Sequence, residues 1–120
     1  GKSVDGLPYI GVQNEAVCCA DANSGMLLTM AEQGDVMGVF VGHDHVNDYI
    51  FNDMGIALAY GRFSGSKTTY GYDVMKINGV RVIEMSENQD GIVPHSFDTW
   101  IRLADNSVIN KVRGPECVAL

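Results

Sequence analysis

The chain has 120 residues, of which 46% are hydrophobic and 19% are charged. This composition is typical of a packed globular protein and argues against a disordered tail, so we treat residues 1–120 as a single domain. Fifteen acidic and eight basic residues give a net charge of −7. Because a negative field repels phosphate backbones, no nucleic-acid partner is expected. No apolar run approaches the roughly 20 residues that cross a bilayer, so no membrane partner is expected either.

The three cysteines follow neither the spacing of a disulfide framework nor that of a zinc site. Cys18 and Cys19 are adjacent, and Cys117 lies near the end of the chain. We therefore expect ordinary buried thiols. The sequence predicts no compartment, because a missing signal peptide is uninformative where the chain is part of a longer protein.

The first elements follow from turn formers and apolar spacing. Residues 1–23 lack a helical or strand period and predict an irregular N-terminal segment. A helix is expected over 26–33, with Asn23 or Ser24 as its N-cap and Gly34 as its left-handed stop. The helix face that we expect in the core consists of Met26, Leu27 and Met30.

A nearly unbroken apolar run over 35–42 follows the helix. Its length and its β-branched residues predict a strand that is covered on both faces and lies deep in a sheet. The polar loop 43–48 comes directly after this strand. Ligand sites of layered α/β folds favour the carboxyl ends of strands, so this loop is the first candidate for chemistry.

The remainder of the chain is rich in hairpin signals. Pairs of strand-like runs flank turn residues three times, and Asn78-Gly79 is the strongest of these turns. Trp100 is expected in the core or at an interface. The predicted hairpins join 49–51 to 56–60, 72–77 to 80–85, and 99–103 to 108–112. These elements predict an α/β fold in the broad sense, with one packed helix and a mixed, mostly antiparallel sheet.

Two histidines one residue apart, His43 and His45, stand at the start of the polar loop. On a regular strand their rings point to opposite faces, whereas in a loop leaving a strand end they can converge on one metal or on two adjacent metals. Gly42 permits the turn and leaves room for a ligand. From the spacing alone, a metal site and an ordinary polar loop both remain open.

Oxygen donors lie close to these histidines in the sequence. Asp44, Asn47 and Asp48 can ligate a metal or orient an imidazole from behind. Asp53 is a further carboxylate that, together with Asp44 and Asp48, can complete a weak mononuclear site. The loop therefore supplies candidate donors of two chemical kinds, imidazole nitrogen and carboxylate oxygen.

Two other polar residues have a functional and an ordinary interpretation. Arg62 lies in a glycine-containing stretch, 61–68, whose residue order departs from that of a P-loop. We place it in a loop near the metal site, where it either touches an anionic substrate or is a surface arginine. His95 lies in a turn-like stretch and is interpreted as a solvated loop histidine.

Three stretches, in order along the chain, carry a family resemblance. The run 38–49, Gly-Val-Phe-Val-Gly-His-Asp-His-Val-Asn-Asp-Tyr, resembles the final metal motif of the calcineurin-like metallophosphoesterases. Its Asn-Asp ending is nearer to the phosphohydrolase branch, which is related to purple acid phosphatases. The runs 59–65 and 79–85 resemble the closing strands of that branch. The resemblance extends from Ser24 to the final hairpin.

The resemblance implies that the chain is the C-terminal part of a metallophosphoesterase domain, one half of a four-layer α/β/β/α sandwich. It further implies that His43 and His45 bind the two metals of a dinuclear centre, with Mn, Fe or Zn as the expected ions. Such metals activate a water molecule that hydrolyses a phosphate ester. The family's Asp-x-His, Gly-Asp-x-x-Asp and Gly-Asn-His motifs do not occur in the sequence.

The missing motifs limit what the chain is expected to do alone. Two imidazoles cannot balance the charge of two divalent cations, so we expect no hydrolysis until an N-terminal half completes the site and binds the phosphate-ester substrate. A sheet face that normally packs on that half is expected to be bare, which predicts a homo-oligomer, most simply a homodimer. The alternative is a stand-alone metal-binding or structural assembly module without catalysis.

Overall fold

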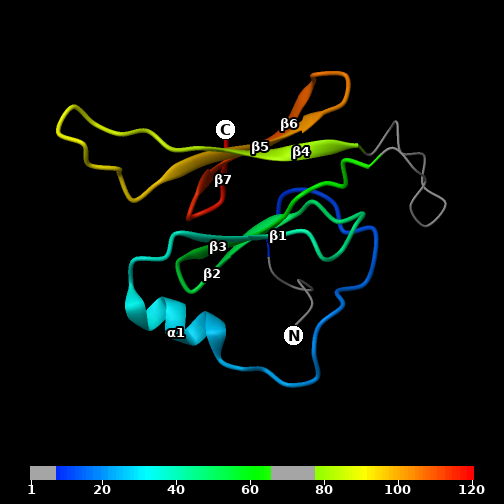
Figure 1. Cartoon of the computed structure of the whole chain (residues 1–120), viewed down its shortest axis with the longest axis horizontal. Helices are drawn as coiled ribbons and strands as arrows, with labels where there is room; N and C mark the ends of the chain where they lie inside the picture. Colours follow the sequence, from blue (N-terminus) through cyan, green and yellow to red (C-terminus); the bar gives the residue numbers. More distant parts are fainter. Residues whose placement is uncertain (1–7, 66–77) are drawn as a thin grey trace.

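The computed structural model describes residues 8–65 and 78–120. In this part the chain forms one helix and two sheets (Figure 1). Helix α1 (Met26–Gln33) precedes the first sheet, which consists of β1 (Gly38–Val41), β2 (Ile50–Asp53) and β3 (Ile56–Tyr60). The second sheet consists of β4 (Gly79–Glu84), β5 (Phe97–Leu103), β6 (Val108–Gly114) and β7 (Val118–Ala119).

The strands pair mostly antiparallel. The first sheet has the order β1-β3-β2, in which β1 runs parallel and β2 antiparallel to β3. The second sheet has the order β4-β5-β6-β7 and is antiparallel throughout. The two sheets form neighbouring layers, and α1 lies beyond the first of them (Figure 1). The predicted α/β class is confirmed, with its strands divided between two sheets, and it is compatible with half of a metallophosphoesterase sandwich.

The core lies between the two sheets. Phe40 of the first sheet meets Phe97 of the second edge-on, with ring centroids 5.5 Å apart. Burial of each large apolar side chain in such a core contributes about 1.5–3 kcal/mol to folding. The buried side chains that join the two sheets are Ile50, Ala57, Ala59, Phe97 and Val112.

Strand β1 departs from its prediction. It forms an edge of the first sheet, and Val41 at its end is 41% exposed. The apolar run therefore does not lie deep in a sheet, because β3 is its one strand neighbour among the described residues. Val39 of β1, Phe51 of β2 and Leu58 of β3 line an apolar hollow of about 230 Å³ on the first sheet. Such a bare face favours association, and the homo-oligomer stays a prediction.

Helix α1 has the predicted bounds and ends at Gly34, which has a φ of 80°. Its N-cap is Gly25, so the predicted cap at Asn23 or Ser24 is wrong. The side chain of Asn23 instead accepts a hydrogen bond from Gly25 N at 2.9 Å, before the helix begins. The predicted core face is wrong in part, since Met26 is 62% exposed and no residue of α1 is buried. No helix within the described ranges is long and apolar enough to cross a membrane.

Two of the three predicted hairpins are confirmed. The turn at Met54-Gly55 joins β2 to β3, and a second turn joins β5 to β6. The strand predicted over 72–77 lies outside the described residues, and β4 pairs with β5. Trp100 is half-buried, and Lys111 Nζ lies 5.3 Å from the centroid of its ring.

The cysteines are less buried than expected. Cys18 and Cys19 are exposed, because they belong to the irregular N-terminal segment outside both sheets. Cys117 is half-buried against the core. Burial raises the pKa of the Cys117 thiol from 9.0 to about 11. The prediction of buried thiols therefore fails for the adjacent pair.

Candidate functional site

The candidate metal loop, residues 43–48, leaves the end of β1 and leads into β2. Its two histidines, His43 and His45, are exposed, and the His45 ring stacks on Phe63 with centroids 6.5 Å apart. The inward-facing polar residues are Asp44, Asn47 and Asp48, none more than 3% exposed. The loop therefore turns its imidazoles outward and its carboxylate and amide groups inward. The role of the histidines as metal ligands stays a prediction.

Asn47 joins the metal loop to the N-terminal segment. Its Oδ1 accepts hydrogen bonds from the backbone N of Asn14 and Glu15 at 2.8 and 3.0 Å. Its Nδ2 donates to Glu15 O at 3.1 Å and to Asp44 Oδ2 at 3.0 Å. Both donors of the amide and both lone pairs of its oxygen are thus used. A fully buried amide with four partners fixes the loop against the segment that crosses it.

Glu15 provides a second attachment that sequence reasoning missed. Its Oε1 accepts a hydrogen bond from Val46 N at 2.9 Å, and the neighbouring Asn14 Nδ2 donates to Val46 O at 3.0 Å. Cys18 N donates to Asp44 Oδ1 at 3.5 Å. No local sequence signal predicts these contacts, because Glu15 and Val46 are separated by 31 residues in the chain.

Asp48 is held from three directions. Its Oδ1 accepts a hydrogen bond from Val12 N at 2.7 Å, and its Oδ2 forms an ion pair with Arg62 Nε at 2.5 Å. Its backbone O accepts a hydrogen bond from Arg81 Nη2 at 2.6 Å. Arg62 is 14% exposed in its side chain, so the interpretation as a surface arginine is wrong. A contact of Arg62 with substrate stays a prediction, and the part played by Arg81 was not foreseen.

The electrostatics of the site follow from burial. Burial and a hydrogen bond to Asp44 raise the pKa of Tyr60 well above its usual 10.0, so its neutral hydroxyl donates to that carboxylate at physiological pH. Burial lowers the pKa of Arg81 from 12.5 to about 10, against the opposing effect of Asp48. Arg81 is still charged near neutral pH. The metal loop is thus contacted by a neutral Tyr60 hydroxyl and by a charged Arg81 guanidinium.

These residues fit part of a metal centre and not the whole of one. Within residues 8–65 and 78–120, no three His, Cys, Asp or Glu side chains come together in a metal-binding group. Asp44 and Asp48 are buried and already hydrogen-bonded, and Asp53 ends β2, the strand that leads away from the metal loop. The weak mononuclear site considered from the sequence is therefore not formed. His95 is exposed, as expected for a loop histidine.

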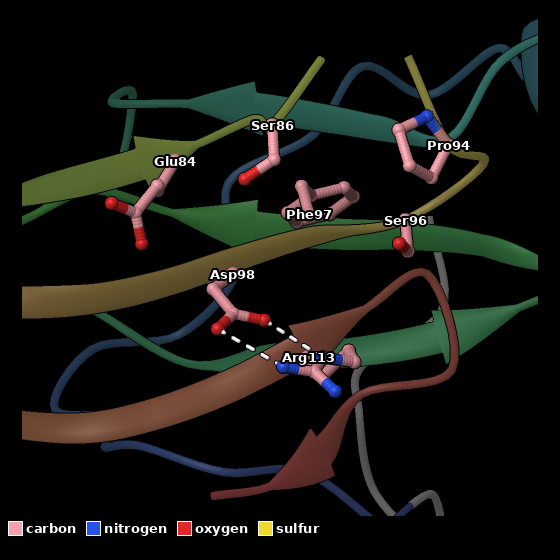
Figure 2. A pocket seen from close by; sticks show the side chains of 7 residues that line it. All are labelled: Glu84, Ser86, Pro94, Ser96, Phe97, Asp98 and Arg113. Carbon is pink, nitrogen blue, oxygen red and sulfur yellow. Dashed lines mark hydrogen bonds and ion pairs between the residues drawn. The ribbon is translucent and has the colours of Figure 1, made fainter. Parts of the chain in front are cut away.

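A separate hollow of about 150 Å³ lies on the second sheet (Figure 2). Its lining includes Glu84, Asp98, Phe97 and Arg113, and Asp98 Oδ1 forms an ion pair with Arg113 Nε at 2.9 Å. Glu84, Asp98 and Arg113 lie opposite one another on three adjacent strands. The hollow contains no histidine or cysteine, so the candidate for metal chemistry remains the metal loop.

The α+β fold with Gly-His-Asp-His at a strand end defines the class of the protein as metallophosphoesterase-like. Probable inactive purple acid phosphatase 29 of Arabidopsis thaliana is 36% identical over 97 residues, which are 79% of this chain and 25% of that protein. Probable inactive purple acid phosphatase 14 of the same organism is 38% identical over 103 residues, 81% of this chain and 25% of that protein. Probable inactive purple acid phosphatase 28 is 43% identical over 54 residues, 45% of this chain and 14% of that protein.

The chain belongs to the calcineurin-like metallophosphoesterase superfamily, in the branch related to purple acid phosphatases. It spans about a quarter of the length of the two relatives that it matches over most of its own length. This is consistent with the C-terminal portion of such a domain. No family model matches the chain, and no solved structure matches it significantly.

Proposed function

We propose that the chain contributes His43 and His45 to a dinuclear metal centre of a phosphoesterase domain whose remaining ligands lie outside these 120 residues. The observation that carries this proposal is the exposure of both imidazoles at the end of β1, while Asp44 between them is buried. Exposed imidazoles that are one residue apart in the sequence, on a loop held by hydrogen bonds, are available to a metal that other ligands complete. The ions expected there are Mn, Fe or Zn, from family membership and from the ligand types.

When bound, metals of this kind activate a water molecule and hold the phosphoryl oxygens of an ester. The chain's own part is to hold the metals through its two imidazoles. Asp44, Asn47 and Asp48, which lie behind the loop, keep these imidazoles in position. Arg62 is proposed to place its positive charge near the anionic substrate as well as on Asp48. Phosphate esters are the proposed substrate class.

Binding without catalysis is the second candidate. The three relatives are named as probable inactive phosphatases, and the described residues do not assemble three metal-binding side chains. In this alternative the same histidines hold a metal for a structural or assembly purpose, and no ester is hydrolysed.

Zinc titration of the purified chain tests the role of the histidines. We expect His43→Ala and His45→Ala each to weaken zinc binding about tenfold or more, since even residues behind the ligands contribute that much. His95→Ala is the matched control, because His95 is an exposed loop histidine outside the metal loop. Equal zinc affinity in all three variants would contradict the proposal.

Hydrolysis of a chromogenic phosphomonoester in the presence of Mn or Zn tests whether other ligands are needed. We expect no turnover from the 120-residue chain. Robust, metal-dependent turnover would mean that the chain completes its own centre. In a longer protein that contains the chain, turnover lost in His43→Ala and kept in His95→Ala would favour catalysis over the binding-only alternative.

A further inference from the structure

Arg81 reaches from the second sheet to the first. It lies on β4, opposite Ile101 of β5. Its guanidinium donates three hydrogen bonds: from Nε to Tyr60 O at 2.9 Å, from Nη2 to Asp48 O at 2.6 Å, and from Nη1 to Thr99 Oγ1 at 3.3 Å. Two of the three acceptors are backbone carbonyls at the end of the first sheet that carries the metal loop.

These two carbonyls mark both ends of the metal loop. Asp48 is the last residue of the metal loop, two positions before β2 begins at Ile50. Tyr60 is paired with Val41, the last residue of β1. The next residue, Gly61, donates a hydrogen bond from its backbone N to Val41 O at 2.8 Å. The metal loop begins two residues after Val41. A single guanidinium therefore binds both β3, which lies beside the start of the loop, and Asp48, which is its last residue. Because the guanidinium is planar and rigid, it also fixes the distance between them.

The second sheet holds Arg81 in this orientation. Thr99 is fully buried, and its Oγ1 donates to Val82 O at 2.6 Å, which leaves its lone pairs to accept from Arg81. Burial of a cation whose direct partners are carbonyl and hydroxyl oxygens costs free energy, and an apolar side chain of similar size often serves stability as well. Arg81 is therefore better explained by the geometry that its hydrogen bonds impose than by a contribution to the stability of the fold.

We propose that Arg81 is a positioning residue for the metal loop. It fixes the ends of residues 43–48, so that His43 and His45 are presented in one arrangement. Its effect on the loop stands on the hydrogen bonds described here, whereas its effect on metal affinity rests on the proposed function of the histidines. Lysine cannot replace it fully, because one ammonium does not reproduce the fork that reaches both carbonyls.

Three variants separate positioning from a general effect on stability. Arg81→Met keeps an unbranched side chain and removes all three hydrogen bonds, and Arg81→Lys keeps the charge. Asn52→Ala is the control, because Asn52 Nδ2 donates to Pro115 O at 2.7 Å and so also joins the two sheets, at the other end of β2. All three are compared with the wild-type chain without metal and with zinc.

Amide hydrogen exchange of the metal loop in the metal-free chain is the first measurement. The probes are the amides of Val46 and Asp48, which are bonded to Glu15 Oε1 and Val12 O. After correction for global stability, we expect exchange at least about tenfold faster in Arg81→Met, an intermediate rate in Arg81→Lys, and no loop effect in Asn52→Ala. The chemical shifts of the His43 and His45 rings should change most in Arg81→Met, less in Arg81→Lys and least in Asn52→Ala. The chemical shifts of the His95 ring should stay the same in all three variants.

Zinc affinity of the same variants is the second measurement, and we expect it to fall most in Arg81→Met. Loop exchange that is unchanged in both Arg81 variants, or equally fast in Asn52→Ala, overturns the positioning role. Should Arg81→Met fail to fold, Arg81→Lys against Asn52→Ala decides by the same criterion. In a longer protein that contains the chain, metal binding that is unchanged by both His43→Ala and His45→Ala overturns the proposed function alone, because loop exchange tests positioning without metal.

Discussion

Among the residues that the structure describes, two Asp–Arg ion pairs lie in very different surroundings. Asp48 and Arg62, behind the metal loop, are 1% and 14% exposed in their side chains. Asp98 and Arg113, at the hollow of the second sheet, are 20% and 57% exposed (Figure 2). Solvent screens the second pair, whereas the first pair lies in the interior, where breaking an ion pair costs much more free energy. The surroundings of an ion pair, more than its residue types, therefore decide how much it contributes to stability.

The neighbours of the two carboxylates widen this difference. Asp48 also accepts a hydrogen bond from Val12 N, so the N-terminal segment depends on it. The described hydrogen bonds of the Asp98 side chain are both to Arg113, and water can replace them. Four experiments test this difference between the buried and the exposed ion pair.

Asp48→Asn should have the largest effect. The neutral amide removes the buried carboxylate charge that Arg62 Nε contacts, and we expect the free energy of unfolding to fall by about 3 kcal/mol or more, because breaking a buried ion pair is strongly destabilising. Urea unfolding followed by the fluorescence of Trp100 measures this. A loss as small as that caused by Asp98→Asn would remove the contrast between the two pairs.

Asn47→Ala should come next. It removes the buried oxygen that accepts hydrogen bonds from the backbone N of Asn14 and Glu15, and we expect a loss of about 2 kcal/mol in the free energy of unfolding. Asn88→Ala is the matched control, since Asn88 accepts two backbone hydrogen bonds in an exposed turn. Equal urea midpoints for the two variants would show that burial of the amide contributes nothing.

Alkaline pH should lower the free energy of unfolding through Cys117 and Tyr60. The pKa of Cys117 is raised from 9.0 to about 11 and that of Tyr60 is raised above 10.0, so the folded state holds both protons more tightly than the unfolded state. Their stabilising contribution is therefore complete below pH 9 and is lost as the pH rises, first through Cys117 and above pH 10 also through Tyr60.

Urea midpoints at pH 8, 9.5 and 10.5 measure this loss. Tyr60→Phe should flatten the fall above pH 10, and Cys117→Ala should flatten the part that begins near pH 9. The opposing shift of Arg81, whose pKa is lowered to about 10, acts only above that pH. A midpoint that stays constant from pH 8 to 10.5 in the wild type would contradict the assignment.

Asp98→Asn should have the smallest effect. Hydrogen bonding to Arg113 lowers the pKa of the Asp98 carboxyl, so its contribution is present above the usual value of 3.8 and is lost as the pH falls below it. Because the pair is exposed, we expect almost no change in the urea midpoint at pH 7 and none in 1 M salt. A large change at pH 7 would mean that the pair is less screened by water than the 57% exposure of the Arg113 side chain indicates.

Local sequence signals predicted the parts of the fold that depend on neighbouring residues. Gly34 ended the helix, the turn at Met54-Gly55 formed the hairpin, and the polar loop followed β1 as expected. Predictions that depended on distant partners were less successful. The apolar run of β1 was expected inside a sheet and lies at its edge. The wrong N-cap, predicted at Asn23 or Ser24, is instead a local error, since Asn23 bonds to Gly25 two residues away.

The sequence by itself determined the α/β class, the family resemblance and the position of His43 and His45, because these are carried by residues within a few positions of one another. Only the tertiary structure decided that Asp44, Asn47 and Asp48 face inward, and that Glu15, Arg62 and Arg81 hold them there. Hydrogen bonds between residues 14 to 33 positions apart leave no local pattern, since they form only after the chain segments have packed together.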